Sequence, residues 1–136
     1  ERFEVLMRCK ELGIPTLVWM TPILPFINDT RENIEGLLDY CLLAGVQGIL
    51  VFDVGVTLRE GDREYFYQAL DRDFPSIRQK YISTYGNAYD IPSPYAKELM
   101  ALIQNTCVAN GMLCSPKECF TYLHEFPERY VQQTLF

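Results

Sequence analysis

Two short, continuously apolar runs constrain the fold of this chain more than any other feature of its sequence. The first is "IPTLVWMTP" (14–22) and the second is "VQGILVFDVG" (46–55). Each run has the length of a strand and is bounded by proline or glycine, which is typical of a strand that is buried on both faces. We therefore predict two strands in a sheet that is covered by helices.

A helix pattern separates the two runs. Asp29 stands at the expected N-cap and Glu32 follows three residues later, which is the spacing of a capping box; Gly45 ends the pattern. A strand, a helix and a second strand predict a βαβ unit with parallel strands and a right-handed crossover. Residues 1–12 also have a helix pattern, so the predicted order is αβαβ, a slice of an α/β barrel or of a doubly wound sheet.

The second half of the chain has a different character. Residues 63–86 are rich in aromatic residues and helical in pattern, and residues 87–94 are predicted to be a loop. Ser93 is expected to cap a further helix, and Pro116 is expected to start a last short one. The predicted organisation is therefore one of βα units over 1–62 followed by a helical C-terminal region over 63–136.

The two predicted strands need further strands beside them. Two parallel strands cannot bury both of their faces alone, so we expect this chain to be the C-terminal part of a longer protein. Without the remaining strands, the open edges and apolar faces are exposed to water. The isolated chain is therefore expected to self-associate, most simply as a symmetric dimer.

Composition excludes several classes of function. The net charge of −6 argues against this chain carrying the main electrostatic footprint of a nucleic-acid binder. Its five cysteines come without a secretion signal, which favours buried reduced thiols in a cytoplasmic protein. The spacing of Cys107, Cys114, Cys119 and His124 fits structural zinc only loosely, so no metal site is assigned. A hydrolase triad and a glycine-rich phosphate loop are also unsupported.

Candidate ligand-binding residues follow the two runs, because ligands gather beyond the carboxyl ends of parallel strands. In the loop 21–29, two prolines stiffen the exit, so that Ile23 and Leu24 could form a wall for a flat ligand such as a purine. Asn28 and Asp29 add polar groups at the start of the helix. The alternative is a rigid turn that aims the helix, with Asp29 serving only as a cap.

The second exit is the loop 53–62. Asp53 ends the apolar run, where a carboxylate needs a ligand, a cap or an ion pair. Thr57 and Arg59 follow in the same loop, and the planar guanidinium of Arg59 suits a carboxylate or a phosphate. The alternative for Arg59 is a surface ion pair with Glu60 or Asp62.

The aromatic residues of the second half also allow two interpretations, a surface on which bases stack or a packing layer that seats the helices. Helical spacing and the acidic background favour the packing layer. These residues are Tyr65, Phe66, Tyr67, Phe74, Tyr81, Tyr85 and Tyr89.

At this point the sequence resembles a known family. The stretch "LMRCKELGIPTLVWMTPILPFINDTRENIEGLLDYCLLAGVQGILVFDVG" resembles the late βα units of radical S-adenosylmethionine (SAM) enzymes. The closer likeness is to the spore photoproduct lyase-like branch, the DNA repair photolyase-type proteins. The stretch from "GVTLREGDREYFYQALDRDFP" to "YGNAYDIPSPYAKEL" is similar to the downstream region of that branch. The resemblance covers roughly residues 5–100, and "PILPFIND" is its most specific part.

The resemblance implies a partial (β/α)6 TIM-like barrel that binds a [4Fe–4S] cluster and SAM, whose cleavage gives a 5′-deoxyadenosyl radical. It also implies a possible DNA substrate. In such enzymes the fifth and sixth strands help to hold the SAM adenine and methionine moieties. The matching positions here are Thr21, Pro22, Ile23, Leu24, Phe52, Asp53 and Val54. The candidates for binding the substrate are Asn28, Thr57 and Arg59.

The sequence departs from the family in the residues that bind the [4Fe–4S] cluster. The three cysteines of the family, spaced Cys-x3-Cys-x2-Cys, are not present, and neither is the glycine-rich site for the SAM amine. We therefore expect no cofactor bound to this chain alone, and the missing N-terminal part of the barrel as its partner. The alternative function is a non-catalytic α/β module that binds a partner through its aromatic helices.

Overall fold

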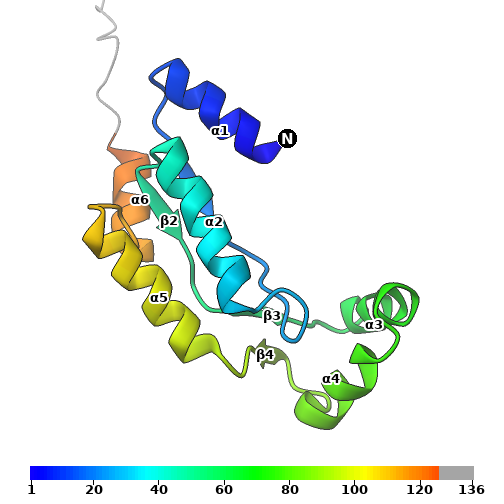
Figure 1. Cartoon of the computed structure of the whole chain (residues 1–136). Helices are drawn as coiled ribbons and strands as arrows, with labels where there is room; N and C mark the ends of the chain where they lie inside the picture. The colour runs from blue at the N-terminus through cyan, green and yellow to red at the C-terminus, as the bar shows by residue number, and fades with distance from the viewer. Residues whose placement is uncertain (126–136) are drawn as a thin grey trace, which may run out of the picture.

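The structure, a computed structural model, describes residues 1–125, which form a crescent with two lobes (Figure 1). The apolar residues fall into two separate clusters, one for each lobe. The larger lobe, called the body here, holds the parallel strands and most of the helices. The smaller one, the α3–α4 lobe, projects from the body at the other end of the crescent.

The body is built on the βαβ unit that the sequence predicts. Strand β1 (Leu17–Trp19) pairs in parallel with β2 (Gly48–Leu50), and α2 (Arg31–Ala44) connects them. The backbone of Gly45 is left-handed, with φ of 64°, and ends α2 where the sequence indicates. The prediction of parallel strands is confirmed, although each strand is only three residues long.

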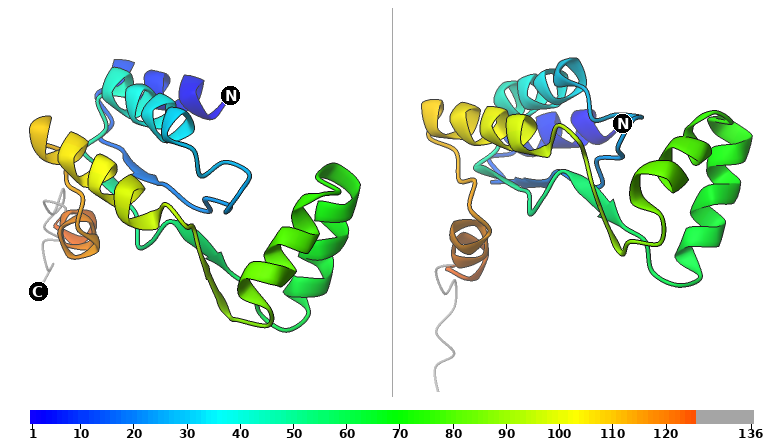
Figure 2. Two further views of the ribbon diagram at one scale, coloured as in Figure 1. Left: turned by 60° about the horizontal axis from the view of Figure 1, so that its bottom comes forward. Right: turned by 90° about the horizontal axis from the view of Figure 1, so that it is seen from below.

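Helices form a layer on one face of this sheet. Three helices, α1 (Arg2–Glu11), α2 and α5 (Ala96–Ala109), lie on that face, and α6 (Pro116–His124) lies on the opposite side (Figure 2). Beside β2, on the side away from β1, Leu113 forms a single parallel bridge with Gly48. A Cβ at Gly48 would lie 2.6 Å from the carbonyl oxygen of Leu113, so only glycine permits this approach.

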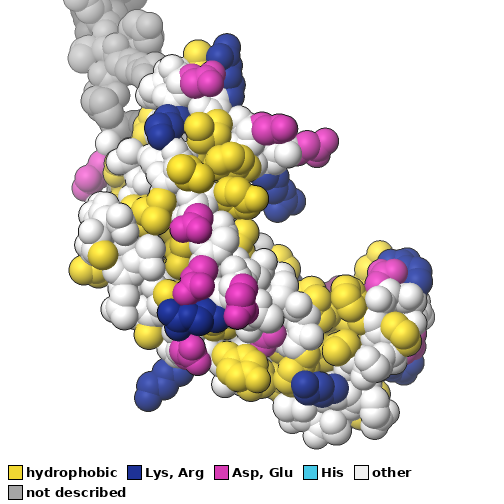
Figure 3. All heavy atoms as spheres, viewed as in Figure 1, with side chains coloured by type: hydrophobic (Ala, Val, Ile, Leu, Met, Phe, Trp, Pro, Cys, Tyr) yellow, Lys and Arg dark blue, Asp and Glu magenta, His cyan; other side chains and the backbone are white. Residues whose placement is uncertain are grey.

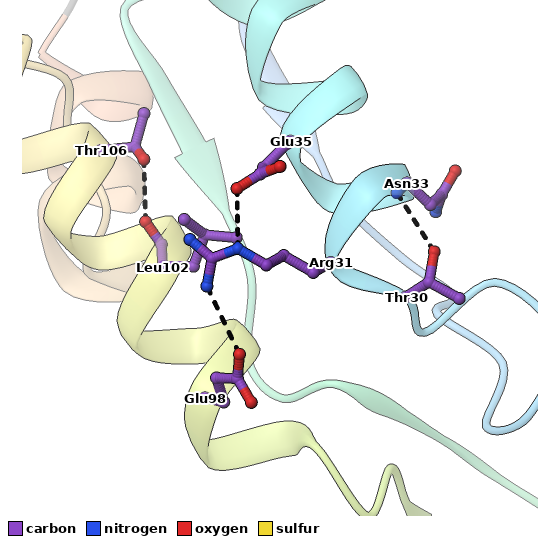
Figure 4. Close-up of polar contacts among 7 residues, drawn as sticks. All are labelled: Thr30, Arg31, Asn33, Glu35, Glu98, Leu102 and Thr106. Carbon is purple, nitrogen blue, oxygen red and sulfur yellow. Dashed lines mark hydrogen bonds and ion pairs between the residues drawn. The ribbon is translucent and has the colours of Figure 1, made fainter.

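The start of α2 differs from the sequence prediction. The N-cap is Thr30, whose hydroxyl accepts a hydrogen bond of 3.2 Å from the backbone N–H of Asn33 (Figure 4). Asp29 lies one residue earlier and is buried, so its assignment as the N-cap is wrong. A threonine and an aspartate in sequence offer the same capping chemistry, and tertiary contacts decide between them.

A second small sheet joins the two lobes. Strand β3 (Gly55–Thr57) pairs antiparallel with β4 (Asp90–Pro92). The prediction that residues 87–94 form a loop is wrong for Asp90–Pro92. Three residues with a single buried apolar side chain, Ile91, are too few to show the alternation that indicates a strand.

The α3–α4 lobe consists of α3 (Asp62–Asp73) and α4 (Ile77–Tyr85). The packing-layer interpretation of its aromatic residues is confirmed only in part. Tyr67 and Tyr81 are buried, and Phe66 and Tyr85 are half-buried in the same cluster. The remaining three are exposed: Tyr65, Phe74 and Tyr89.

The chain returns to the body after β4. Helix α5 begins at Ala96, and its N-cap residue, Tyr95, makes no side-chain cap. The capping role predicted for Ser93 is confirmed only in part, because its hydroxyl accepts a hydrogen bond of 3.0 Å from the backbone N–H of Tyr95, directly before the helix. Helix α6 begins at Pro116, as predicted, with Ser115 and Glu118 forming a capping box. At the surface, Arg31 of α2 joins Glu35 at 2.8 Å and Glu98 of α5 at 3.4 Å (Figure 4).

The described residues thus form a mixed α/β fold with two small sheets, and they close no barrel. The predicted division at residue 62 falls at the start of α3. Helices α5 and α6 nevertheless pack on the body, since Leu99, Ile103 and Cys107 belong to its core. The end of the predicted helical region, residues 126–136, lies outside the described part of the chain.

Candidate ligand-binding cleft at the strand exits

The carboxyl ends of β1 and β2 open onto one cleft, called the strand-exit cleft here. Its volume is about 320 Å³. Both loops that the sequence singles out contribute to it, which confirms that the two exits lie at the same edge of the sheet. The lining residues are Thr21, Pro22, Phe52, Asp53, Gly55, Val56, Thr57, Asp90, Ile91 and Pro92.

The first wall of the cleft comes from the exit of β1. The backbone N–H of Met20 donates to the carbonyl of Leu50 at 2.9 Å, which continues the parallel ladder to the rim of the cleft. The chain then turns through Thr21 and Pro22, joined by a cis peptide bond. Both side chains are exposed to the cleft, whereas Ile23 points into the core of the body with 2% of its surface exposed.

The second wall comes from the exit of β2. The Asp53 carboxylate accepts a hydrogen bond of 2.7 Å from the backbone N–H of Val54, which fixes its position at the strand end. The Phe52 ring is 59% exposed and lies 6.0 Å from the Trp19 ring, centroid to centroid. An exposed aromatic face therefore stands next to an exposed carboxylate.

The floor of the cleft is the β3–β4 pair. Thr57 and Asp90 face each other in the antiparallel register, which brings a second carboxylate and a second hydroxyl to the cleft. Gly55 permits this pairing, because a Cβ there would lie 2.5 Å from the carbonyl oxygen of Ile91. Asp90 was not among the predicted site residues. Its place in the site depends on the β3–β4 pairing, which the sequence pattern does not indicate.

Several predicted site residues do not line the strand-exit cleft. Val54 is fully buried in the core of the body. The side-chain oxygen of Asn28 accepts a hydrogen bond of 2.5 Å from the backbone N–H of Leu24, which closes the loop on itself. Arg59 is fully exposed; a hydrogen bond with Tyr89, and then the Asp62 carboxylate, raise the pKa of its guanidinium above the usual range.

The apolar residues of the loop 21–29 have a structural role instead. Pro25 is buried, and its carbonyl oxygen accepts a hydrogen bond of 2.7 Å from the Tyr81 hydroxyl of α4. The Phe26 ring packs edge-on against Tyr81 at 5.6 Å, with the Lys80 amine 4.1 Å from its centroid. The semi-apolar loop is therefore a joint between the lobes, which favours the rigid-turn interpretation for its second half.

A buried polar pair lies behind this loop and was missed by sequence reasoning. The Ser93 hydroxyl donates to the Asp29 carboxylate at 2.5 Å, and both side chains are at least 95% buried, with 5% and 2% exposed. The Ser93 hydroxyl also accepts from the backbone N–H of Tyr95, and the Ser93 N–H donates to the carbonyl of Val54. The pair thus links the loop, β3 and the approach to α5. The two residues lie far apart in sequence, and no local pattern could have paired them.

The lining chemistry restricts the ligand. The strand-exit cleft presents two carboxylates, two hydroxyls and one aromatic ring, and none of its lining residues is a Lys, Arg or His. Carboxylates accept hydrogen bonds from sugar hydroxyls and attract cations, and they repel phosphate. The cleft therefore suits a flat, hydroxyl-bearing ligand that is neutral or positively charged.

The cysteines lie away from this cleft. Cys41, Cys107 and Cys119 are buried in the body. Burial raises the pKa of Cys41 to about 11 and that of Cys107 to about 12, with the neighbouring Cys114 as a second cause for Cys107. Thiols with raised pKa values stay protonated at neutral pH, which makes them poor nucleophiles. Within residues 1–125, no three His, Cys, Asp or Glu side chains come together to hold a metal ion.

The helices are too short or too polar for a membrane. Among the described residues, none has both the length and the apolar character that crossing a bilayer requires.

Comparison with known proteins gives relatives but no family. No family model matches the chain, and no solved structure matches it. It is 29% identical over 98 residues to proteins of Mycobacterium tuberculosis and Mycobacterium bovis, both described as uncharacterized. The match covers 72% of this chain and 28% of each relative. The chain is thus similar to one segment of considerably longer proteins.

Proposed function

We propose that this chain is part of a radical SAM enzyme of the DNA repair photolyase-type branch, and that the strand-exit cleft binds the adenosine part of SAM. The observation that carries the proposal is the composition of the cleft. An aromatic ring, two carboxylates and two hydroxyls meet there, with no basic side chain among the lining residues. The sequence resemblance supplies the family, and the cleft supplies a place for one part of its cofactor.

The lining residues fit the adenosine part of SAM chemically. The exposed face of Phe52 suits stacking with the adenine ring. The carboxylates of Asp53 and Asp90 suit the ribose hydroxyls, and their charge favours the positive sulfonium centre. SAM, when bound, would supply the group that is cleaved to a radical; these residues would bind and orient it.

The chain's cysteines do not fit a [4Fe–4S] cluster. None of them lines the strand-exit cleft, and no Cys-x3-Cys-x2-Cys spacing occurs in the sequence. Cluster ligation requires thiolates that are accessible to iron, and burial favours the protonated thiol at Cys41 and Cys107. The ligands of the cluster would therefore belong to another part of a longer protein.

A DNA substrate would also depend on the rest of the protein. The net charge of this chain is −6, and phosphate binding requires clustered Lys and Arg. Within the proposed enzyme this chain contributes one side of the cofactor pocket, in a cytoplasmic setting, and the basic surface for DNA would lie elsewhere.

Because this chain would hold only one side of the pocket, no stable SAM complex is expected with it alone, and the test looks for weak binding. It is a titration of the isolated chain, followed by NMR of its backbone amides. SAM, S-adenosylhomocysteine, adenosine and ATP are added in turn. We expect shifts at Thr21, Gly55 and Thr57 with SAM, and an affinity for SAM at least about tenfold above that for ATP, because the carboxylates repel phosphates. Asp53→Asn and Phe52→Ala should each weaken SAM binding. Arg59→Ala, which alters an exposed side chain outside the cleft, is the matched control.

Equal binding of ATP and SAM, or shifts that lie away from the cleft, would refute the adenosine proposal. That result would favour a second candidate function, a non-catalytic module that binds a protein partner through its aromatic helices. The observation in its favour is the exposure of Tyr65, Phe74 and Tyr89, of which Tyr65 is 75% exposed. Tyr65→Ser would weaken capture of such a partner and leave SAM binding unchanged.

A further inference from the structure

We infer that the open edge of β1 receives a parallel β-strand, which lies beneath α1 and belongs to the same longer polypeptide. The inference rests on the proposed function in one respect, since it names the element that continues the barrel next to the strand-exit cleft. Its evidence is separate and comes from the groove beside β1.

The first observation is the open edge itself. Strand β1 pairs with β2 on one side, and within residues 1–125 no strand pairs with its other side. The backbone N–H of Met20 points to β2. Because alternate residues of a strand point to opposite sides, the N–H groups of Leu17 and Trp19 point to the open edge. An uncovered edge of this kind is a template for a further strand.

The second observation is an apolar groove along this edge, called the β1 groove here. Its volume is about 560 Å³. Helix α1 forms its roof, with Val5 62% exposed over it, and β1 forms its wall, with Trp19 59% exposed. Hydrophobic side chains gather where α1 meets α2 (Figure 3). The apolar lining includes Phe3, Val5, Leu6, Val18, Trp19, Met20, Leu37 and Tyr40.

The handedness of the chain fixes the position and direction of the missing strand. Helices α1 and α2 lie on the same face of the sheet (Figure 2). The crossover from β1 through α2 places β2 on one side of β1. A right-handed crossover through α1 on the same face therefore places its preceding strand on the opposite side of β1, parallel to it. That position is the β1 groove.

The occupant is thus an apolar strand that packs under α1 and leads into it. Strands of this kind belong to parallel sheets that are covered by helices. The relatives are long enough to supply one, because the matched segment is only 28% of their length. A second copy of the chain is the competing occupant, since it can offer its own apolar edge.

The experiment adds such a strand to the full chain. A run of about five Val and Ile residues is joined to Glu1 through a loop of about five Gly, Ser and Asp residues, the usual length of such connections. The matched control carries the same extension with a central proline, which cannot pair within a sheet. Amide hydrogen exchange is measured at Leu17 and Trp19, the fluorescence of Trp19 is recorded, and light scattering gives the mass. Trp19 is the sole tryptophan, so its emission reports on the surroundings of β1.

We expect the strand extension to slow exchange at both amides at least about tenfold relative to the proline control, with a monomeric mass and a shift of Trp19 emission to shorter wavelength. Val5→Asp should abolish this protection, because it places a charge in the roof of the β1 groove. Val108→Asp, at a position of α5 that is 80% exposed and outside the groove, should leave it intact.

Equal exchange in the two extended chains would overturn the inference, and so would a dimer that persists with β1 protected in both, which would assign the edge to a second copy. Repeating the SAM titration on the extended chain separates this inference from the proposed function. Protection of β1 without SAM binding refutes only the cofactor proposal, and SAM binding without protection refutes only the strand.

Discussion

The body and the α3–α4 lobe are stabilised by different kinds of contact. The core of the body is mainly aliphatic, with Ile34, Ile49 and Ile103 fully buried between helices and sheet. The core of the lobe is centred on Tyr81, and it contacts the body through hydrogen bonds to backbone carbonyls as well as through ring packing. The body is thus built mainly on periodic apolar residues, whereas the lobe depends more on a few long-range contacts of individual side chains.

The largest effect is expected at Tyr81, where the two lobes meet. Tyr81→Ala removes a fully buried ring and should lower the free energy of unfolding by about 4 kcal/mol. Tyr81→Phe removes only the hydroxyl that donates to Pro25, and should cost about 1 kcal/mol. Hydrogen exchange should show faster opening of α3 and α4 while α2 keeps its protection. Equal acceleration in α2 would mean that the lobes unfold as one unit, and the comparison would fail.

A smaller effect is expected at Arg63 of α3. Its guanidinium donates to the carbonyls of Leu58, Gly86, Asn87 and Ala88, at 2.6 to 3.3 Å, and so ties α3 to the chain that returns into β4. Arg63→Ala should lower the free energy of unfolding by about 2 kcal/mol, measured by urea denaturation. Arg63→Lys should not restore it, because an ammonium lacks the planar set of donors.

Arg72 of the same helix is the matched control. It pairs with the adjacent Asp73 at 2.8 Å, and both side chains are largely exposed. Arg72→Ala should cost less than about 0.5 kcal/mol. Equal losses for the two variants would show that Arg63 stabilises the lobe only as a surface charge.

High pH should act on both regions through buried neutral groups. Burial raises the pKa of Cys107 from 9.0 to about 12 in the body, and burial also raises the pKa of Tyr81 in the lobe. In each case the unfolded state ionises first, so stability is fully present below pH 9 and falls as the pH rises toward 12. Cys107→Ala should reduce this fall in denaturation experiments between pH 8 and 10, to a smaller extent than the losses above. An unchanged pH profile would contradict the assignment to this thiol.

The smallest effect is expected at the surface pair between α2 and α5. Arg31 and Glu98 lie 3.4 Å apart with more than half of each side chain exposed (Figure 4). A double-mutant cycle of Arg31→Ala and Glu98→Ala should give a coupling energy below about 0.5 kcal/mol, which falls further in high salt. A coupling above 1.5 kcal/mol would show that the body also depends on individual polar contacts.

The sequence predicts the body better than the lobe for physical reasons. The apolar periodicity around Leu38 and the glycine at position 45 are local features, and they indicate α2 and its end correctly. The pairing of β3 with β4 and the link from Asp29 to Ser93 depend on residues far apart in sequence. Local propensity leaves such contacts undetermined, because the preference for a strand depends strongly on the tertiary neighbours of the residues.

The candidate site shows the same division. Thr21, Pro22, Phe52 and Asp53 follow directly from strands that the pattern indicates, and they line the cleft. The position of Asp90 in the cleft and the hydrogen bond by which Asn28 closes its loop can be seen only in the tertiary structure. The radical SAM resemblance, the DNA substrate and the self-association of the chain remain predictions.

The antiparallel pairing of β3 with β4 has a topological consequence. Thr57 and Asp90 face each other, so the chain leaves the body and returns to it at the same point. Residues 58–89 are therefore an excursion, and a two-residue Asn-Gly turn could close the pair without altering the path of the body. Because its two ends are adjacent, the length and surface of this excursion can be changed while the strand-exit cleft keeps its walls. The lobe is in this sense an exchangeable module, with Phe26 as the part of the body that would have to adapt.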